Sequence, residues 1–341
     1  MTPASADIEA CAAAIRGGSK TFFAASLLLP KSTRLAAYAV YAFCRYSDDA
    51  IDVAAGNLAA LDNLRRRLAL IYDGRPIDHF ADRAFAGVVV QYAIPVDLPA
   101  ALLEGFAYDV EQRRYQTLGE LEDYAARVAG SVGAIMACLM GARSREALAR
   151  ATDLGAAMQL TNIARDVGED ARNRRLYLPL DAMAQHGCDP DAFLAAPHFS
   201  PAIGAIVKDL LSRAATLYQR GAAGIGFLPG DCRAAIGAAC VIYADIGREI
   251  GAAGHDSVTS RAVVSTSRKL ALLASAVAGV RQDHALRNLP PLEANRFLVE
   301  AAFTSMPQPI PPASLDDQIA GVIDLLARLE RRERVGDAAA Y

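Results

Sequence analysis

The sequence predicts an all-α fold built around a central cavity. Helical periodicity runs through almost the whole 341-residue chain, and no convincing alternation of polar and apolar residues marks a strand. Alanine is abundant and runs of β-branched residues are few, which favours helices. Hydrophobic residues make up 53 % of the chain, enough for a sizeable core. Acidic residues on the expected buried face of two helices indicate that this core encloses a polar site.

The helices predicted in the first third of the chain are separated by prolines and glycines. Pro30 and Pro99 lie at or near helix starts, where the missing amide hydrogen is harmless. The segment Gly-Arg-Pro at 74–76 breaks the chain between them. The helices expected in this part are Ala6–Arg16, Lys31–Ala54, Leu58–Tyr72, His79–Tyr92 and Pro99–Gln112.

In the rest of the chain Pro201 lies at a helix start, and turn-forming residues at 187–190 and 229–231 separate neighbouring helices. The helices expected here are Leu118–Gly141, Arg145–Ala171, Pro201–Gly224, Cys232–Gly254, Val263–Arg287 and Leu315–Arg334. The proline-rich stretch 289–313 is typical of a linker. It would separate a main domain, residues 5–288, from a charged C-terminal helix and tail, residues 314–341.

Composition and charge exclude several classes of protein. A net charge of −3 gives no support for nucleic-acid binding. The six cysteines show no CxxC pair and no zinc-ligand spacing, which indicates a reduced, cytoplasmic protein. The N-terminal residues lack the pattern of a secretory signal. The longest uncharged run, Val128–Ala142, is too short to span a bilayer. We therefore expect a soluble protein, for which peripheral contact with a membrane stays open.

Two polar stripes mark the expected site. Tyr41, Arg45, Asp48 and Asp52 are spaced i, i+4, i+7, i+11, so they share one face of a helix. A second stripe has nearly the same spacing in another predicted helix, over a hundred residues later. It consists of Gln159, Asn162, Asp166 and Asp170. Both follow the periodicity of a core face although their residues are polar or charged, which suggests two facing walls of one cavity.

The cost of burying charge indicates what such a cavity binds. A bare buried carboxylate is strongly unfavourable unless it is paired, protonated or bound to a metal. Oxygen ligands without His or Cys favour Mg²⁺ or Mn²⁺ over zinc. Because Mg²⁺ is commonly shared between carboxylates and substrate phosphates, the expected ligand is a diphosphate bridged by metal between two helices. The simpler alternative, a solvated acidic surface, fits one isolated acidic pair better than two matched stripes.

Six segments of the chain resemble the squalene and phytoene synthases, which join prenyl diphosphates head to head. The segments are Gly18–Phe23, Tyr41–Asp52, Tyr124–Gly133, Gln159–Asp170, Arg175–Pro179 and the C-terminal Gly254–Leu270. The first five occur in order at the separations typical of that family, and the resemblance extends over about residues 5–288. Within the family the chain looks most similar to the bacterial phytoene synthases.

The resemblance implies a fold and a reaction. The fold would be an isoprenoid-synthase-type helical bundle around a central apolar cavity. Two molecules of geranylgeranyl diphosphate would condense through a cyclopropyl diphosphate, prephytoene diphosphate, to phytoene in the first committed step of carotenoid biosynthesis. The expected cofactor is Mg²⁺, with Mn²⁺ as the alternative, and no NADPH would be consumed. A membrane could receive the water-insoluble product, and a desaturase would act next.

The resemblance also implies roles for individual residues. The metal ligands would be Asp48, Asp52, Asn162, Asp166 and Asp170. Diphosphate would be bound by Ser19, Thr21, Arg45, Gln159, Arg165 and Arg261. The cavity would be lined by Phe22, Tyr41, Tyr124, Tyr177 and Tyr243. For Tyr124 both a proton-relay role and a plain core role stay open, and Phe22 could equally pack against the prenyl chain or the core. Catalysis itself would rest on Asp48, Asp52, Asp166, Asp170, Tyr124 and Arg45.

Three alternatives remain at this point. A squalene, dehydrosqualene or presqualene diphosphate synthase would use the shorter farnesyl diphosphate, and the metal motifs do not distinguish it. A head-to-tail chain elongator is disfavoured because the chain lacks a second DDxxD motif. A non-enzymatic helical scaffold is disfavoured because both acidic stripes are intact.

Overall fold

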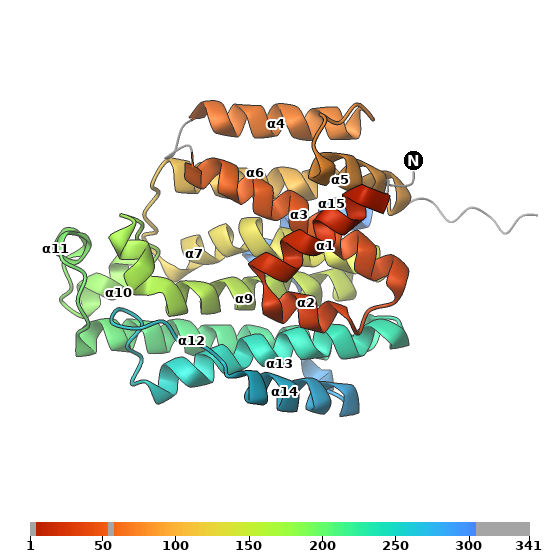
Figure 1. Cartoon of the computed structure of the whole chain (residues 1–341). Coiled ribbons are helices and arrows are strands. Elements are labelled where there is room, and N and C mark those ends of the chain that lie inside the picture. The colour runs from red at the N-terminus through yellow and green to blue at the C-terminus, as the bar shows by residue number, and fades with distance from the viewer. Residues whose placement is uncertain (1–4, 54–57, 305–341) are drawn as a thin grey trace, which may run out of the picture. The chain divides into compact units, whose positions relative to one another are not determined.

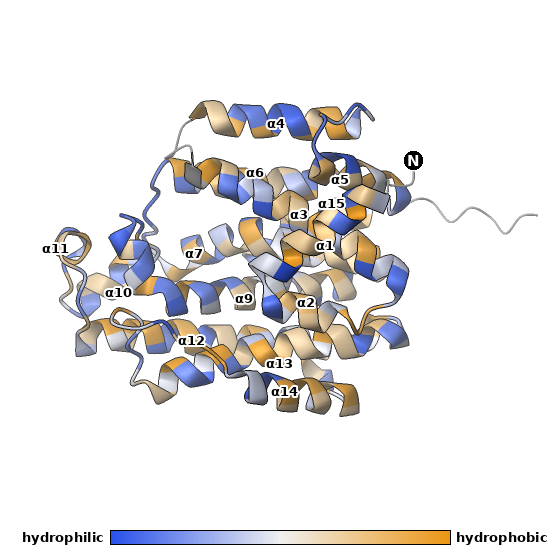
Figure 2. Ribbon diagram, in the orientation of Figure 1, coloured by the Kyte–Doolittle hydropathy of each residue, from blue (hydrophilic) through white to orange (hydrophobic). Residues whose placement is uncertain are grey.

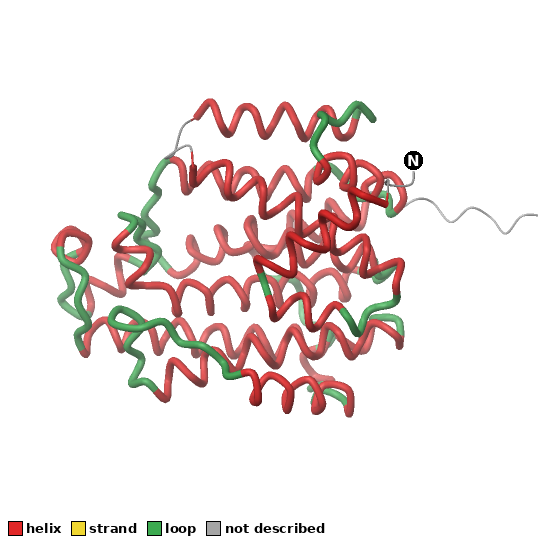
Figure 3. Tube along the Cα trace, in the orientation of Figure 1, coloured by secondary structure: helices red, strands yellow, loops and turns green. Residues whose placement is uncertain are grey.

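The structure, a computed structural model, describes residues 5–53 and 58–304, except for the side chains of Asp52 and Val53. All regular structure in this part of the chain is helical, as predicted (Figure 3). The α-helices are α1 (Ser5–Gly18), α2 (Lys20–Ser26), α3 (Lys31–Val53), α4 (Leu58–Tyr72), α5 (Phe80–Gln91), α6 (Asp97–Val110), α7 (Leu118–Ala125), α8 (Ser131–Leu139), α9 (Arg145–Arg172), α10 (Leu180–Gln185), α11 (Pro190–Ala195), α12 (Pro201–Ala223), α13 (Gly230–Ala252), α14 (Thr266–Ala278) and α15 (Arg296–Thr304). Short turns of other helix types are η1 (Ala126–Gly130), η2 (Ile225–Phe227), η3 (His284–Leu286) and η4 (Glu293–Asn295).

Most of the long predicted helices are confirmed, and their ends differ from the prediction by at most two residues. The larger departures from the prediction are of three kinds. The helix expected at Leu118–Gly141 contains one π-helical turn, η1, between α7 and α8. The helix expected at Val263–Arg287 is confined to α14, which Ser265 caps and which ends before Gly279 at φ +117°. Four short helices, α2, α10, α11 and α15, were not predicted. With six to nine residues each, they are too short for apolar periodicity to reveal them.

Helix α9 lies in the middle of the bundle, with α12 and α13 on one side (Figure 1). It also packs on α8 and η1. Glycines allow the backbones to approach closely on the α8 side. A methyl group on Gly133 would lie 2.3 Å from the Ala151 carbonyl oxygen, and one on Gly155 would lie 2.3 Å from that of Ala129. Since any larger residue would push the helices apart, these glycines fix the second acidic stripe close to η1.

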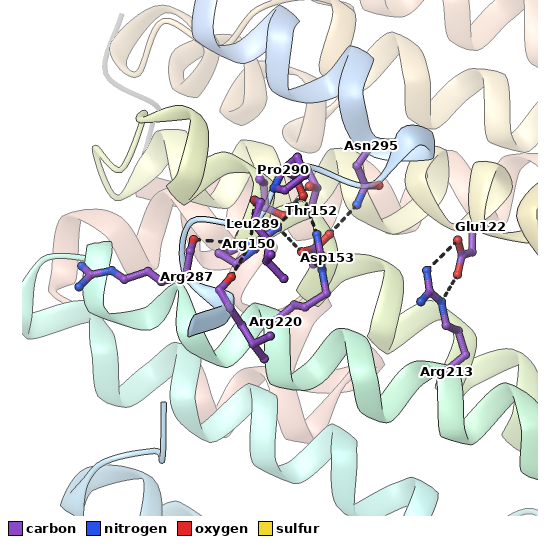
Figure 4. A network of polar contacts seen from close by, with 12 residues as sticks. Glu122, Arg150, Thr152, Asp153, Arg213, Arg220, Arg287, Leu289, Pro290 and Asn295 are labelled. Atoms are coloured by element: carbon purple, nitrogen blue, oxygen red, sulfur yellow. Dashed lines mark hydrogen bonds and ion pairs between the residues drawn. The ribbon is translucent and has the colours of Figure 1, made fainter. Parts of the chain in front are cut away.

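A buried polar network fastens the segment before α15 to α9 and α12 (Figure 4). Arg150, 1 % exposed, pairs with the buried Asp153 at 2.8 Å and donates to the carbonyl oxygens of Leu286 and Leu289 at 2.7 and 3.1 Å. Arg220 donates to the same Asp153 carboxylate at 2.9 Å. Asn295 completes the group with a 3.2 Å bond to Asp153.

Most of the described part of the predicted linker, residues 289–304, is helical. Residues 293–304 form η4 and α15, and Leu298, Val299 and Ala302 are buried in the main hydrophobic core. The linker prediction is therefore wrong for these residues. Pro290 and Pro291 precede η4 and α15, and α15 packs on α6, α8 and α9. The helix predicted at Leu315–Arg334 lies outside the described residues. No helix of the described chain is both long enough and apolar enough to cross a bilayer.

Candidate active site

A polar cavity of about 510 Å³ opens between α2, α3, α6, α9 and α13. Its volume is within the usual range of small-molecule sites. Both predicted stripes contribute to its walls, as Tyr41, Arg45 and Asp48 line it from α3, and Gln159 and Asn162 line it from α9. The two polar helix faces thus meet at one cavity.

The α9 stripe has features that favour a cation. The Asn162 side-chain oxygen is buried and has no hydrogen-bond partner among the described residues. Burial, with the nearby negative charge of Asp166, raises the pKa of Asp170 to about 7. An unpartnered amide oxygen and a carboxylate with a raised pKa would both be stabilised by a nearby positive charge. The donor set therefore fits a metal ion that prefers oxygen ligands.

Asp166 is held by two arginines. Arg165 donates to both carboxylate oxygens at 2.8 and 2.6 Å, and Arg261 donates to them at 2.7 and 3.3 Å. Burial alone would raise the pKa of Asp166, but these bonds lower it below its ordinary value. Both arginines also line the cavity, so their guanidinium groups lie where a diphosphate could replace the carboxylate as their acceptor.

The α3 stripe is partly paired within its own helix. Arg45 lines the cavity and binds Asp49, which is outside the stripe, at 2.9 and 3.1 Å. Asp48 lines the cavity beside it. Asp52 lies at the end of α3, and its side chain is outside the described part of the structure. Tyr41, Arg45 and Asp48 thus lie in the cavity wall, as predicted.

Helix α2 brings a hydroxyl pair and an aromatic ring to the cavity. Ser19 and Thr21 both line it, and the Ser19 hydroxyl also caps α2 by accepting from the Phe22 amide at 3.2 Å. Phe22 stacks on Tyr243 of α13 with ring centroids 4.9 Å apart. Burial raises the pKa of Tyr243 to about 12, which keeps its phenol neutral.

Sequence reasoning missed Asp109. This carboxylate, on α6, lines the cavity and accepts hydrogen bonds from Tyr124 at 2.9 Å and from Tyr177 at 2.6 Å. The rings of Tyr124 and Tyr177 stack 5.2 Å apart, and Tyr115 lies beside them. Of the two predicted tyrosines, Tyr124 lines the cavity and Tyr177 lies behind it. A lone aspartate without a spaced partner gave no sequence signal.

A second, apolar cavity of about 350 Å³ adjoins the first and shares several of its walls. The shared side chains include Phe22, Tyr41, Asn162 and Tyr243. Beyond them the walls are aliphatic and sulfur-containing, with Val132, Met136, Met140, Leu154, Met158 and Ile236. One polar chamber that continues into an apolar one suits a molecule with a charged head and a hydrocarbon tail.

The described side chains do not by themselves form a preassembled metal centre. Among them, no three His, Cys, Asp or Glu residues group closely enough to hold an ion. Instead, Asp166 is held by Arg165 and Arg261. Assembly of the centre would require the arginines to exchange Asp166 for a phosphate group.

Comparison with known proteins identifies the family. The family model for squalene/phytoene synthase matches residues 15–269. A phytoene synthase from Rhodobacter capsulatus is 51 % identical over 275 residues, which cover 80 % of this chain and 81 % of the relative.

The chain belongs to the squalene/phytoene synthase family.

Two further comparisons concern nearly the whole length of the chain and its fold. A phytoene synthase from Cereibacter sphaeroides is 45 % identical over 346 aligned positions, covering 97 % of this chain and 96 % of the relative. A crystal structure of a dehydrosqualene synthase in complex with ligand aligns with a TM-score of 0.73 and 32 % identity, covering 80 % of this chain and 96 % of the other. The predicted isoprenoid-synthase-type helical fold is confirmed. Members of this family generally use a divalent metal.

Proposed function

We propose that this chain is a phytoene synthase that joins two molecules of geranylgeranyl diphosphate head to head. The observation that carries the proposal is a polar cavity with carboxylate, amide and guanidinium groups that continues into an apolar cavity. Identity of 45–51 % to two bacterial phytoene synthases supports the choice of product within the family. The reaction forms a cyclopropyl diphosphate first and phytoene second, with release of one diphosphate in each half.

The metal ligands we propose are Asp48, Asp52, Asn162, Asp166 and Asp170. When bound, Mg²⁺ or Mn²⁺ supplies Lewis-acid stabilisation of the leaving diphosphate. The chain's own contribution begins with binding. Arg45, Arg165 and Arg261 hold the diphosphate through their planar guanidinium groups. Ser19 and Thr21 donate hydrogen bonds to it, and Gln159 contacts it from α9.

The apolar walls protect the carbocations. Phe22, Tyr41 and Tyr243 line both cavities at their junction, where the allylic end of a bound chain would lie. Exclusion of water prevents hydrolysis of the cation, and the electron-rich ring faces stabilise positive charge. These residues need no charge of their own for either effect.

Tyr124 and Asp109 form the proton acceptor that we propose for the deprotonation steps. Burial, followed by neighbouring Tyr177 and Asp109, raises the pKa of Tyr124 well above its ordinary value, so the phenol is neutral and donates to Asp109. A lone pair of the Tyr124 oxygen can then accept a proton from carbon while the phenol hydrogen passes to the Asp109 carboxylate. In the first half the C–H bond electrons close the cyclopropane ring, and in the second half they form the alkene. In both cases the proton leaves through Asp109.

Product analysis tests the function. Purified protein would be incubated with geranylgeranyl or farnesyl diphosphate, Mg²⁺ and no NADPH, and the hydrocarbons would be separated by chromatography. Phytoene from the C20 substrate is expected, with EDTA abolishing it. Faster turnover of farnesyl diphosphate would instead indicate a C30 synthase, an activity that the structural match to a dehydrosqualene synthase makes the main competitor.

A further inference from the structure

The outer face of α14 is apolar and exposed. Leu270 and Val277 are each 62 % exposed and lie seven residues apart, on one side of the helix. Val263, in the segment that leads into α14, is 69 % exposed. Exposed Ala271 and Ala274 lie between them, and Figure 2 shows α14 as a largely apolar helix at the edge of the bundle. We call Val263, Leu270 and Val277 the α14 face.

This face adjoins the mouth of the polar cavity. Val263 and Lys269 line that cavity, and the α14 face continues from them along the helix. The opposite side of α14 packs on α13 through the buried Ala276, so the exposed side is the outer surface of the bundle (Figure 1). Leu273, beside it, packs in the same small cluster as Leu28, which follows α2.

The charge around the face is positive. Residues 257–282 include four basic side chains and no acidic one, in a chain with a net charge of −3. Arg261 and Arg268 are paired with Asp166 and Asp245. Lys269 and Arg281 have no ion-pair partner among the described residues, so they leave uncompensated positive charge on either end of α14.

We propose that the α14 face docks the protein on an anionic lipid bilayer. Apolar side chains that project from a helix with basic neighbours match the way such helices lie in a membrane interface. A second copy of the chain fits less well, because a symmetric contact would bring like charges together and the face is small for a stable dimer. The biological role of this docking rests on the proposed function. The prenyl substrates and the hydrocarbon product dissolve in lipid, and the cavity mouth would face the bilayer.

Vesicle binding of the full-length protein tests this without reference to activity. The probes are vesicles of phosphatidylcholine alone and of phosphatidylcholine with about a third phosphatidylglycerol, and binding is measured by co-sedimentation. The variant is Leu270→Glu with Val277→Glu. The matched control is Leu58→Glu with Val90→Glu, since these side chains are 62 % and 70 % exposed on α4 and α5. None of the four side chains lines either cavity.

We expect the wild type and the control to bind the anionic vesicles and the α14 variant to bind at least about tenfold more weakly. Binding should also weaken with added salt and on neutral vesicles. Equal binding by all three proteins, or equal loss in both variants, would overturn the proposal. Absence of wild-type binding would do the same, and a change of oligomeric state in the α14 variant would then assign the face to a second copy.

The two proposals fail separately. Turnover in detergent should be unchanged in the α14 variant, and its circular dichroism spectrum should match that of the wild type. A protein that binds anionic vesicles through α14 but yields no phytoene would refute the function and leave the docking face intact. Phytoene formation without vesicle binding would refute the docking face and support the proposed function.

Discussion

Gly168 lies on α9 between Asp166 and Asp170, where the loop that carries Arg261 crosses the helix. Its amide donates to the Ser257 carbonyl at 3.0 Å. A methyl group at this position would lie 2.3 Å from the Val258 carbonyl oxygen and 2.7 Å from its Cα. Ordinary contact needs roughly 1 Å more. Because both atoms belong to the backbone, Gly168→Ala must displace the loop.

The displacement would separate Arg261 from Asp166. Their two hydrogen bonds are 2.7 and 3.3 Å long, and a shift of roughly 1 Å takes both beyond good hydrogen-bond length. Overpacking costs about 1–3 kcal/mol, which the better helix propensity of alanine offsets by about 1 kcal/mol. If Arg261 binds diphosphate as we propose, misplacement of its guanidinium group by this distance can lower turnover by about a hundredfold.

Steady-state kinetics and thermal unfolding measure both effects. The matched control is Gly251→Ala in α13. The nearest atom to the new methyl group outside the helix's own backbone would be the His255 Nε2, at 3.7 Å. That variant should be more stable by about 0.5–1 kcal/mol and fully active. If Gly168→Ala had the kinetic constants and melting temperature of the control, the loop would not position Arg261 and the reasoning would be refuted.

Three other predictions, two of them with a control substitution, concern buried polar groups. Tyr124→Phe should lower kcat by about 10²-fold or more with little change in KM. Tyr115→Phe should leave kcat unchanged, because the Tyr115 hydroxyl is buried without a partner among the described residues. Similar kcat values for the two variants would show that Tyr124 is not on the proton path. Hydrogen bonds from Arg268 and Arg248 lower the pKa of Asp245 from 3.8 to about 2 against the effect of burial, so its stabilisation is present above about pH 4 and is lost as the pH falls through 2. In denaturant titrations, the free energy of unfolding of Asp245→Asn should therefore be about 1–2 kcal/mol below that of the wild type at neutral pH, and this difference should shrink between pH 4 and 2. A difference that does not depend on pH would contradict the prediction. Asp153→Ala should cost about 3–5 kcal/mol in unfolding free energy, because the buried Arg150 and the partly buried Arg220 lose their counter-charge. Asp191→Ala, at an exposed pair, should cost at most about 1 kcal/mol.

The sequence predicted what depends on spacing along one helix. The stripes on α3 and α9 were visible because helical periodicity alone places Tyr41, Arg45 and Asp48 on one face, and Gln159 and Asn162 on another. That these faces meet at one cavity follows from tertiary packing, in which Gly133 and Gly155 bring α8 and η1 close to α9. The long helices were predicted for the same reason.

What spacing does not encode could not be predicted. Asp109 is a single carboxylate whose importance comes from two tyrosines, one of them 68 residues away. The pairing of Arg261 with Asp166 spans 95 residues and depends on the path of a loop. Helix α15 was mistaken for part of a linker because prolines lie on both sides of it in the sequence. The burial of Leu298 depends on packing against α6, α8 and α9, which are distant in the sequence.

Mn²⁺ binding measured by electron paramagnetic resonance, in the presence of inorganic pyrophosphate, tests most directly whether the two stripes share a metal-bound diphosphate. The wild-type protein should take up Mn²⁺ when pyrophosphate is present. Asp48→Asn on α3 and Asp166→Asn on α9 should each weaken that uptake by at least about tenfold while the helical content is unchanged. Wild-type Mn²⁺ affinity in both variants would contradict a site shared between the two helices.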